Sequence, residues 1–157
     1  MKIETNQPAP SFTALDQNGK SHSLSDYKGK WVLLYFYPQD DTSGCTKEAC
    51  AIRDNFSGFN KLDAVVLGVS PDSVDSHTKF ADKYNLPFTL LADEDKQVIN
   101  AYGVWGPKSF LGKSYEGVVR MSFLIDPQGK IAKVYEKVKP AEHAEQVLED
   151  LQQLRTG

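Results

Sequence analysis

The sequence predicts one α/β domain over residues 1–157, with a small mixed β-sheet at its centre and helices on both faces. Two unbroken apolar runs, 31–37 and 64–69, have the length of strands and lack the alternation of a half-exposed sheet. They therefore indicate strands that are covered on both sides. A helix predicted over 42–60 joins them into a βαβ unit with a right-handed crossover.

The residues before the first buried strand are expected to add an N-terminal β-hairpin. Extended segments at 12–15 and 21–24 flank Asp16-Gln17-Asn18-Gly19, which has the composition of a turn. Residues 25–29 then form a single helical turn that ends at a glycine.

After residue 69 helices and strands continue to alternate. A helix is predicted over 74–84, a short extended piece over 88–91, and a helix over 93–102 whose leading acidic residues suit its positive end. Residues 103–117 are predicted as an irregular loop, and a loop of that length is often functional.

The C-terminal part is predicted to form a hairpin and a closing helix. Strands at 118–126 and 131–136 flank the turn Asp126-Pro127-Gln128-Gly129. Pro140 opens the last helix at the first position, where proline is tolerated. The apolar stripe of this helix consists of Val147, Leu148, Leu151 and Leu154.

Composition narrows the function classes. Hydrophobic residues make up 40% and charged residues 25% of the chain, as in ordinary globular domains, and the net charge is −3. This balance gives no reason to expect a nucleic acid or an anionic membrane as partner. No apolar run approaches the roughly 20 residues that span a bilayer. The N-terminal residues resemble neither a secretory signal nor a transit peptide, so we expect a cytosolic protein with reduced thiols.

The two cysteines, Cys45 and Cys50, are the most informative residues. On a helix that begins near Thr42, Cys45 lies in the first turn, on the side that packs inward. Cys50 lies about 140° away around the helix, towards water. Five residues of helix separate two Cα atoms by about 8–9 Å, whereas a disulfide needs roughly 4.4–6.8 Å. A bond between these cysteines would therefore require the first turns to unwind, around residues 42–52.

The position of Cys45 favours a reactive thiol. Its helix begins at the carboxyl end of a buried strand, where unpaired amides and the helix dipole favour an anion. An ordinary thiol is only about 3% ionised at neutral pH, so full ionisation gains at most roughly 30-fold, against the ~10⁶-fold or more that enzymes supply. A further polar group is needed. Arg120 is the candidate if its strand runs antiparallel to 31–37, and Thr42 is expected either to cap the helix or to donate to the substrate.

The segment Pro38-Gln39-Asp40-Asp41-Thr42-Ser43-Gly44-Cys45, followed by Thr46-Lys47-Glu48, resembles the P-x-x-x-T-x-x-C motif of the peroxiredoxins. The nearby Cys50, Gly103-Val104-Trp105-Gly106 and the stretch 120–126 are similar to the bacterioferritin comigratory protein (PrxQ) branch. The resemblance covers nearly the whole chain. One departure is Ser43, which stands where the family usually has proline.

The resemblance implies a thioredoxin-like fold and a two-cysteine peroxidase that reduces hydrogen peroxide and organic hydroperoxides without metal or organic cofactor. Cys45 would be the peroxidatic cysteine and Cys50 the resolving one. Pro38 would shield the pocket, Thr42 would hydrogen-bond the peroxide, and Arg120 would activate it. The resemblance also implies a thioredoxin-type protein reductant and a monomer.

Two other functions remain open. A dithiol–disulfide oxidoreductase of thioredoxin type is disfavoured because its C-x-x-C spacing is absent. A non-catalytic redox-sensing or metal-delivery module would also show reactive cysteines, but His22, His77 and His143 have no ligand-type spacing. Glu48 is interpreted as either an orienting partner of Arg120 or a solvated helix residue. The aromatic residues of the long loop are expected to anchor it rather than to contact substrate; they are Trp105, Phe110 and Tyr115.

Overall fold

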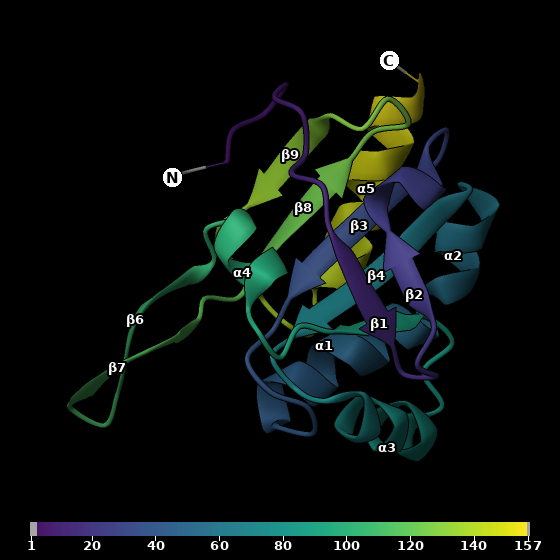
Figure 1. The fold of residues 1–157 in the computed structure, drawn as a ribbon. Coiled ribbons are helices and arrows are strands. Elements are labelled where there is room, and N and C mark those ends of the chain that lie inside the picture. Colours follow the sequence, from purple (N-terminus) through teal and green to yellow (C-terminus); the bar gives the residue numbers. More distant parts are fainter. Residues whose placement is uncertain (1–2, 157) are drawn as a thin grey trace.

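The computed structural model describes residues 3–156, apart from the side chains of Phe110 and Thr156. The strands of the main sheet are β1 (Thr13–Asp16), β2 (Ser21–Ser23), β3 (Trp31–Phe36), β4 (Ala64–Ser70), β5 (Thr89–Ala92), β8 (Met121–Ile125) and β9 (Ile131–Tyr135). They form a seven-stranded mixed sheet in the order β2-β1-β5-β4-β3-β8-β9 (Figure 1). The predicted α/β class is confirmed.

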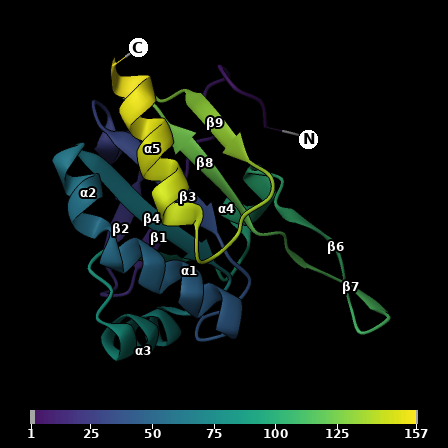
Figure 2. The same ribbon diagram turned by 180° about the vertical axis from the view of Figure 1, so that it is seen from behind.

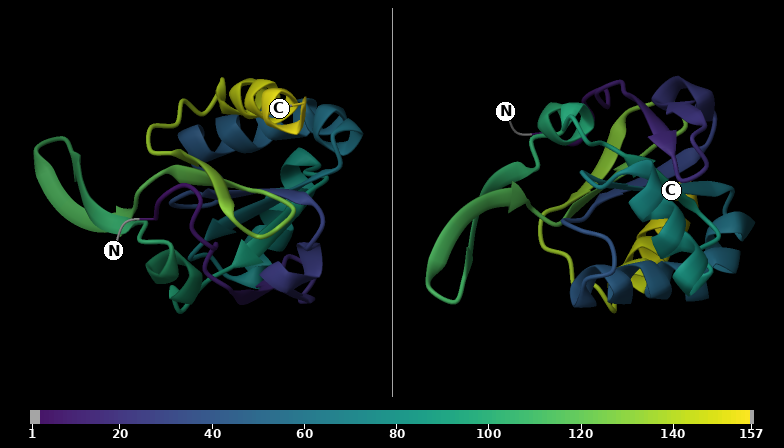
Figure 3. Two further views of the ribbon diagram at one scale, coloured as in Figure 1. Left: turned by 90° about the horizontal axis from the view of Figure 1, so that it is seen from above. Right: turned by 60° about the horizontal axis from the view of Figure 1, so that its bottom comes forward.

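The helices lie on both faces of this sheet (Figure 2). They are α1 (Ser43–Asp54), α2 (Phe56–Lys61), α3 (Val74–Tyr84), α4 (Gln97–Ala101) and α5 (His143–Thr156), and a 3-10 turn, η1, spans Leu24–Tyr27. One core cluster joins the sheet to α1, α2, α3 and α5, and a second joins its other face to α4 and the N-terminal segment (Figure 3). Within residues 3–156, no helix combines the length and the apolar character needed to cross a membrane.

The two apolar runs form the neighbouring parallel strands β3 and β4 at the centre of the sheet. Leu33 and Tyr35 of β3 point into one core cluster, while Leu34 and Phe36 point into the other. This explains why the run shows no polar alternation. β8 flanks the other side of β3 and runs antiparallel to it, with Met121 opposite Phe36. The residue before β8 therefore lies at the sheet edge where the chain leaves β3 for α1.

The single helix predicted over 42–60 is wrong in one respect, because the structure divides it into α1 and α2 at Asn55. The Asn55 side chain donates from Nδ2 to the carbonyl of Ala51 at 2.8 Å. Such local side-chain bonds compete with the helical backbone. The predicted inward face is confirmed for Cys45, Ala49, Ile52 and Phe59, which are buried, whereas Phe56 is half-buried.

Two other helices begin later than predicted. α4 begins at Gln97 rather than at residue 93. The Asp93 carboxylate accepts hydrogen bonds from the backbone amides of Val98 and Ile99 at 3.1 and 2.8 Å. Asp93 therefore caps the N-terminal end of the helix and is not part of it. α5 begins at His143, and residues 140–142 form a turn, so Pro140 does not open the helix. Leu154, expected in the apolar stripe of α5, is 41% exposed.

The prediction of an irregular loop over 103–117 is wrong. The segment is a β-hairpin of β6 (Trp105–Phe110) and β7 (Lys113–Val118) that projects from the body of the protein (Figure 1). Leu111 and Gly112 at its tip have positive φ values of 53° and 79°, which suits a two-residue hairpin turn. Glycine and proline within these two segments lower their β-strand propensity, and for this reason the sequence did not predict the strands.

The aromatic residues of this hairpin differ in their environment. Trp105 is half-buried and packs against the core, as expected of an anchor. Tyr115 is 49% exposed, so it is not an anchor in the core. The side chain of Phe110 lies outside the described residues.

Both predicted terminal hairpins are present. β1 pairs with β2 around the turn at Asp16, and β1 also pairs with β5, so the N-terminal hairpin extends the main sheet. β8 and β9 flank the turn that begins at Asp126, whose Oδ1 accepts the amides of Gln128 and Lys130 at 2.9 Å each.

Candidate functional site

Cys45 and Arg120 meet at the start of α1, as the sequence predicts. The Arg120 guanidinium donates from Nη2 to the Cys45 Sγ at 3.2 Å. Cys45 is 2% exposed and occupies the third position of α1, while Arg120 directly precedes β8. The antiparallel pairing of β8 with β3 brings these residues together although they are 75 positions apart in the chain.

Glu48 is the third member of this arrangement. Its side chain is completely buried, and its Oε1 accepts from the Arg120 Nη1 at 2.6 Å. The alternative of a solvated helix residue is therefore wrong. The sequence carried a signal for this position, because Glu48 follows Cys45 by three residues and so shares the inward face of α1. A carboxylate on an apolar helix face is usually paired.

Burial shifts the protonation of this pair. It raises the pKa of Glu48 to about 7, against the opposing effect of Arg120. Burial lowers the pKa of Arg120, but Cys45 and Glu48 outweigh it and leave that pKa raised. Among the described residues, Glu48 Oε2 and Tyr35 Oη are buried side-chain atoms without a hydrogen-bond partner. Burial, followed by the nearby Glu48, raises the pKa of Tyr35 well above its usual value, so this phenol stays neutral.

Gly44 and Lys108 belong to the surroundings of the site, and sequence reasoning missed both. A Cβ at Gly44 would lie 3.1 Å from the Arg120 Nη2, so the absence of a side chain lets the guanidinium approach the helix. Lys108 reaches back from the β6–β7 hairpin, and its Nζ donates to the carbonyl of Val118 at 2.9 Å. Its pKa is lowered by burial and then by Arg120, while Cys45 opposes this shift.

Thr42 and Pro38 lie where the sequence predicts, in the segment between β3 and α1. Thr42 has the extended backbone of an N-cap residue, but its hydroxyl makes no bond to the helix amides. The hydroxyl donates instead to the carbonyl of Gln39 at 3.0 Å. The prediction that its side chain caps the helix is therefore wrong. Pro38 lies two residues after the end of β3 and is half-buried.

Cys50 lies on the same unbroken helix as Cys45. α1 runs from Ser43 to Asp54, and both cysteines are free thiols. Cys50 is half-buried, in contrast to the buried Cys45. The intact helix keeps the two Cα atoms about 8–9 Å apart, beyond the span of a disulfide. A disulfide between them requires α1 to unwind.

A cluster of potential metal ligands lies elsewhere. Within the described part of the chain, Asp40, Asp72 and His77 bring ligand atoms within 4.8 Å of one another. The Asp40 and His77 side chains hydrogen-bond each other, and the Asp40 amide donates to Asp72.

His143 is buried beside Ser122, and burial lowers its pKa to about 4, so it is neutral.

Comparison with known proteins agrees with this geometry. Residues 5–134 match the model of the AhpC/TSA family. Peroxiredoxin Bcp of Bacillus subtilis is 47% identical over 154 residues, which cover 98% of this chain and 98% of that protein.

Solved structures are similar over almost their full length. A bacterioferritin comigratory protein of Xanthomonas campestris, solved in trapped intermediate and ligand complexes that concern its alkyl peroxide reduction activity, superposes with a TM-score of 0.88. It is 35% identical, and the match covers 97% of each chain. A cysteine-to-serine variant of PrxQ from Xylella fastidiosa has a TM-score of 0.93 and 31% identity, covering 99% of each chain.

Proposed function

The chain belongs to the AhpC/TSA family and, within it, to the Bcp peroxiredoxins, and on this premise we propose how it reduces hydroperoxides. It is a thiol-dependent peroxidase. Cys45 attacks the peroxide and Cys50 resolves the oxidised product. The observation that carries this assignment is the 3.2 Å contact between Arg120 Nη2 and Cys45 Sγ at the start of α1.

In the first step the Cys45 thiolate attacks the terminal oxygen of a hydroperoxide. The S–O bond forms as the O–O bond breaks, Cys45 becomes a sulfenic acid, and the departing alkoxide or hydroxide takes up a proton. Arg120 interacts with both reactants in this step. Its positive charge stabilises the thiolate, and its fixed N–H groups can donate hydrogen bonds to a peroxide oxygen. Glu48 holds the guanidinium in that orientation through the 2.6 Å ion pair.

Thr42 and Pro38 complete the pocket in this proposal. The Thr42 hydroxyl donates to the Gln39 carbonyl, and its oxygen can accept a hydrogen bond from the O–H group of the hydroperoxide. Pro38, half-buried between β3 and the loop, shields the reacting sulfur from water. Their positions in the segment between β3 and α1 support both roles.

In the second step the Cys50 thiolate attacks the sulfenic sulfur of Cys45. A disulfide forms and the sulfenic oxygen leaves as water, so no further oxidant is needed. The continuous helix supports a step that begins with unwinding, since Cys45 and Cys50 cannot bond while α1 is intact.

A dithiol protein of thioredoxin type then returns two electrons and two protons to the disulfide. Both oxidising equivalents pass through sulfur, so the cycle itself requires no metal or organic cofactor. The two free thiols suit a reducing compartment such as the cytosol. We take the working unit to be a monomer.

The substrate class is hydrogen peroxide and organic hydroperoxides. The alkyl peroxide reduction activity of the Xanthomonas campestris relative supports the organic members of this class.

Stopped-flow peroxide consumption with wild type, Cys45→Ser and Cys50→Ser tests the proposal. Cys45→Ser should lose all activity. Cys50→Ser should still form one equivalent of sulfenic acid but should fail to recycle through a disulfide. Peroxide consumption by Cys45→Ser at the wild-type rate would contradict the assignment. Efficient reduction of insulin disulfides in place of peroxide would instead indicate a dithiol oxidoreductase.

A further inference from the structure

The loop between β3 and α1 contains a buried carboxylate, that of Asp40. Three donors converge on it: the Tyr37 hydroxyl at 2.6 Å, the Ser76 hydroxyl at 2.8 Å and the His77 Nδ1 at 2.7 Å. The Asp40 side chain is 4% exposed and that of His77 is 0% exposed. Tyr37 directly follows β3, while Ser76 and His77 belong to α3. The loop that leads into α1 is therefore attached to α3 by buried hydrogen bonds.

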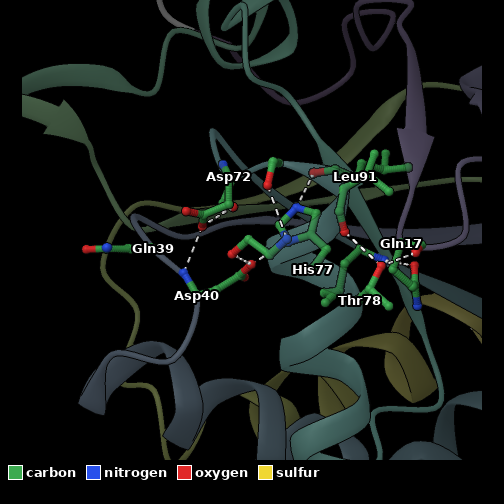
Figure 4. A network of polar contacts seen from close by, with 12 residues as sticks. Gln17, Gln39, Asp40, Asp72, His77, Thr78 and Leu91 are labelled. Atoms are coloured by element: carbon green, nitrogen blue, oxygen red, sulfur yellow. Dashed lines mark hydrogen bonds and ion pairs between the residues drawn. The ribbon is translucent and has the colours of Figure 1, made fainter.

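His77 is hydrogen-bonded at both of its ring nitrogens. Its Nδ1 faces the Asp40 carboxylate, and its Nε2 faces the carbonyl of Leu91 on β5 at 2.9 Å (Figure 4). The ring is therefore held in one orientation between the loop and β5. The other titratable groups around the pair are Tyr37, which donates to Asp40, and Asp72, whose Oδ2 accepts the Asp40 amide at 2.8 Å. Asp40 and His77 thus form a buried, hydrogen-bonded pair.

α3 also contacts both sides of the segment that carries the cysteines. Asp41, at a positive φ of 59°, accepts from the Lys83 Nζ and the Tyr84 hydroxyl at 2.7 Å each. At the far end of α1, the Arg53 Nη1 donates to the carbonyl of Tyr84 at 2.7 Å. One helix therefore holds the chain just before Thr42 and again just after Cys50.

We propose that Asp40 and His77 are positioning residues of the peroxidase, and that they fix the start of α1 against α3 in both redox states. The inference rests on the proposed disulfide between Cys45 and Cys50. With the chain held at Asp40 and at Arg53, the unwinding that joins the cysteines is limited to the residues between them. When α1 rewinds, Thr42 and Cys45 return to the same place opposite Arg120.

Hydrogen exchange on the wild-type protein tests the limits of the unwinding without any substitution. Reduced and disulfide forms should differ in amide protection between Thr42 and Ile52. Protection of residues 37–41 and of α3 should be the same in both forms. Loss of protection at Asp40 in the disulfide form would overturn the proposal.

Asp40→Asn tests the positioning role, because it preserves shape and removes the charge. In a Cys50→Ser background, peroxide attack should slow by about tenfold to a hundredfold, as expected when a reacting group is misplaced. When Asp40→Asn is made in the protein that retains Cys50, disulfide formation from the sulfenic acid should not slow. Loss of the contacts that fix the start of α1 does not hinder the unwinding of this helix. Equal slowing of both steps would indicate a purely structural role and would contradict the proposal.

Thr78→Val is the matched control. Thr78 follows His77 on α3, and its hydroxyl donates to the carbonyls of Gln17 and Val74, away from the loop (Figure 4). Both steps should keep the wild-type rates in this variant, and a loss equal to that of Asp40→Asn would count against a specific role for the pair. Peroxide consumption by Cys45→Ser would instead refute the proposed function itself.

Discussion

Glu48 and Arg120 form an ion pair of which only one member reaches solvent: the Glu48 side chain is 0% exposed and that of Arg120 is 20% exposed. The same guanidinium contacts Cys45 with its other terminal nitrogen. A buried carboxylate on one side and a sulfur on the other leave the arginine little rotational freedom. The orientation of Arg120 therefore depends on a residue that the reaction does not touch.

Glu48→Gln should slow peroxide attack by about tenfold, because the amide keeps the volume of the carboxylate but weakens its hold on the guanidinium. Stopped-flow measurement in a Cys50→Ser background isolates this step. Glu145→Gln, an exposed glutamate on α5, is the control and should leave the rate unchanged. A wild-type rate in Glu48→Gln would show that Arg120 is oriented by other contacts.

Glu48 should also make folding stability depend on pH. Its pKa is about 7 in the folded protein, against 4.5 for an ordinary glutamate. Between these values the folded state holds more protons than the unfolded state, so the free energy of unfolding falls as pH rises. The fall attributable to Glu48 should be at most about 3.5 kcal/mol, taking about 1.4 kcal/mol for each pKa unit. Urea titrations at several pH values in this range should show that the free energy of unfolding falls less steeply with pH in Glu48→Gln than in wild type. An equal pH dependence in the two proteins would contradict the raised pKa of Glu48.

Gly44→Ala separates stability from activity. Alanine favours a helix by up to ~1 kcal/mol over glycine, so α1 should not be weakened. Its Cβ, however, would lie 3.1 Å from the Arg120 Nη2 and would push the guanidinium away from its place. We expect a melting temperature equal to or above that of wild type, with slower peroxide attack. Ser43→Ala, one residue earlier and exposed, should change neither.

Lys108→Met should slow peroxide attack about threefold at low ionic strength, and less in high salt, because a half-buried cation near the thiolate is removed. Lys113→Met alters an exposed lysine of the same hairpin and should have no effect. Rates measured over a range of salt concentrations make this comparison. An effect of equal size from both lysines would point to the net charge rather than to the position of Lys108.

The sequence predicted those parts of the site that depend on regular structure. The apolar runs located β3 and β4, and an antiparallel β8 was enough to bring Arg120 to Cys45. The break at Asn55 and the late start of α4 depend on single side chains that bond nearby backbone, which a periodic pattern does not reveal.

Other features depend on contacts between distant segments. His77 lies 37 positions after Asp40, and neither residue has a neighbour in sequence that marks the pair. The need for Gly44 arises only because Arg120 comes from another part of the chain. The β6–β7 hairpin was missed because its strands pair only with each other and hold glycine and proline, so neither burial nor composition identified them.

Because both thiols share α1, the enzyme presents different surfaces to its two partners. The intact helix contributes Cys45, Ala49 and Ile52 to the core and holds the sulfur of Cys45 beside Arg120. In the proposed disulfide form, the unwound residues would lose part of that packing and would become exposed as an irregular segment. A reducing protein that recognised this segment would ignore the resting enzyme and engage only molecules that have already turned over.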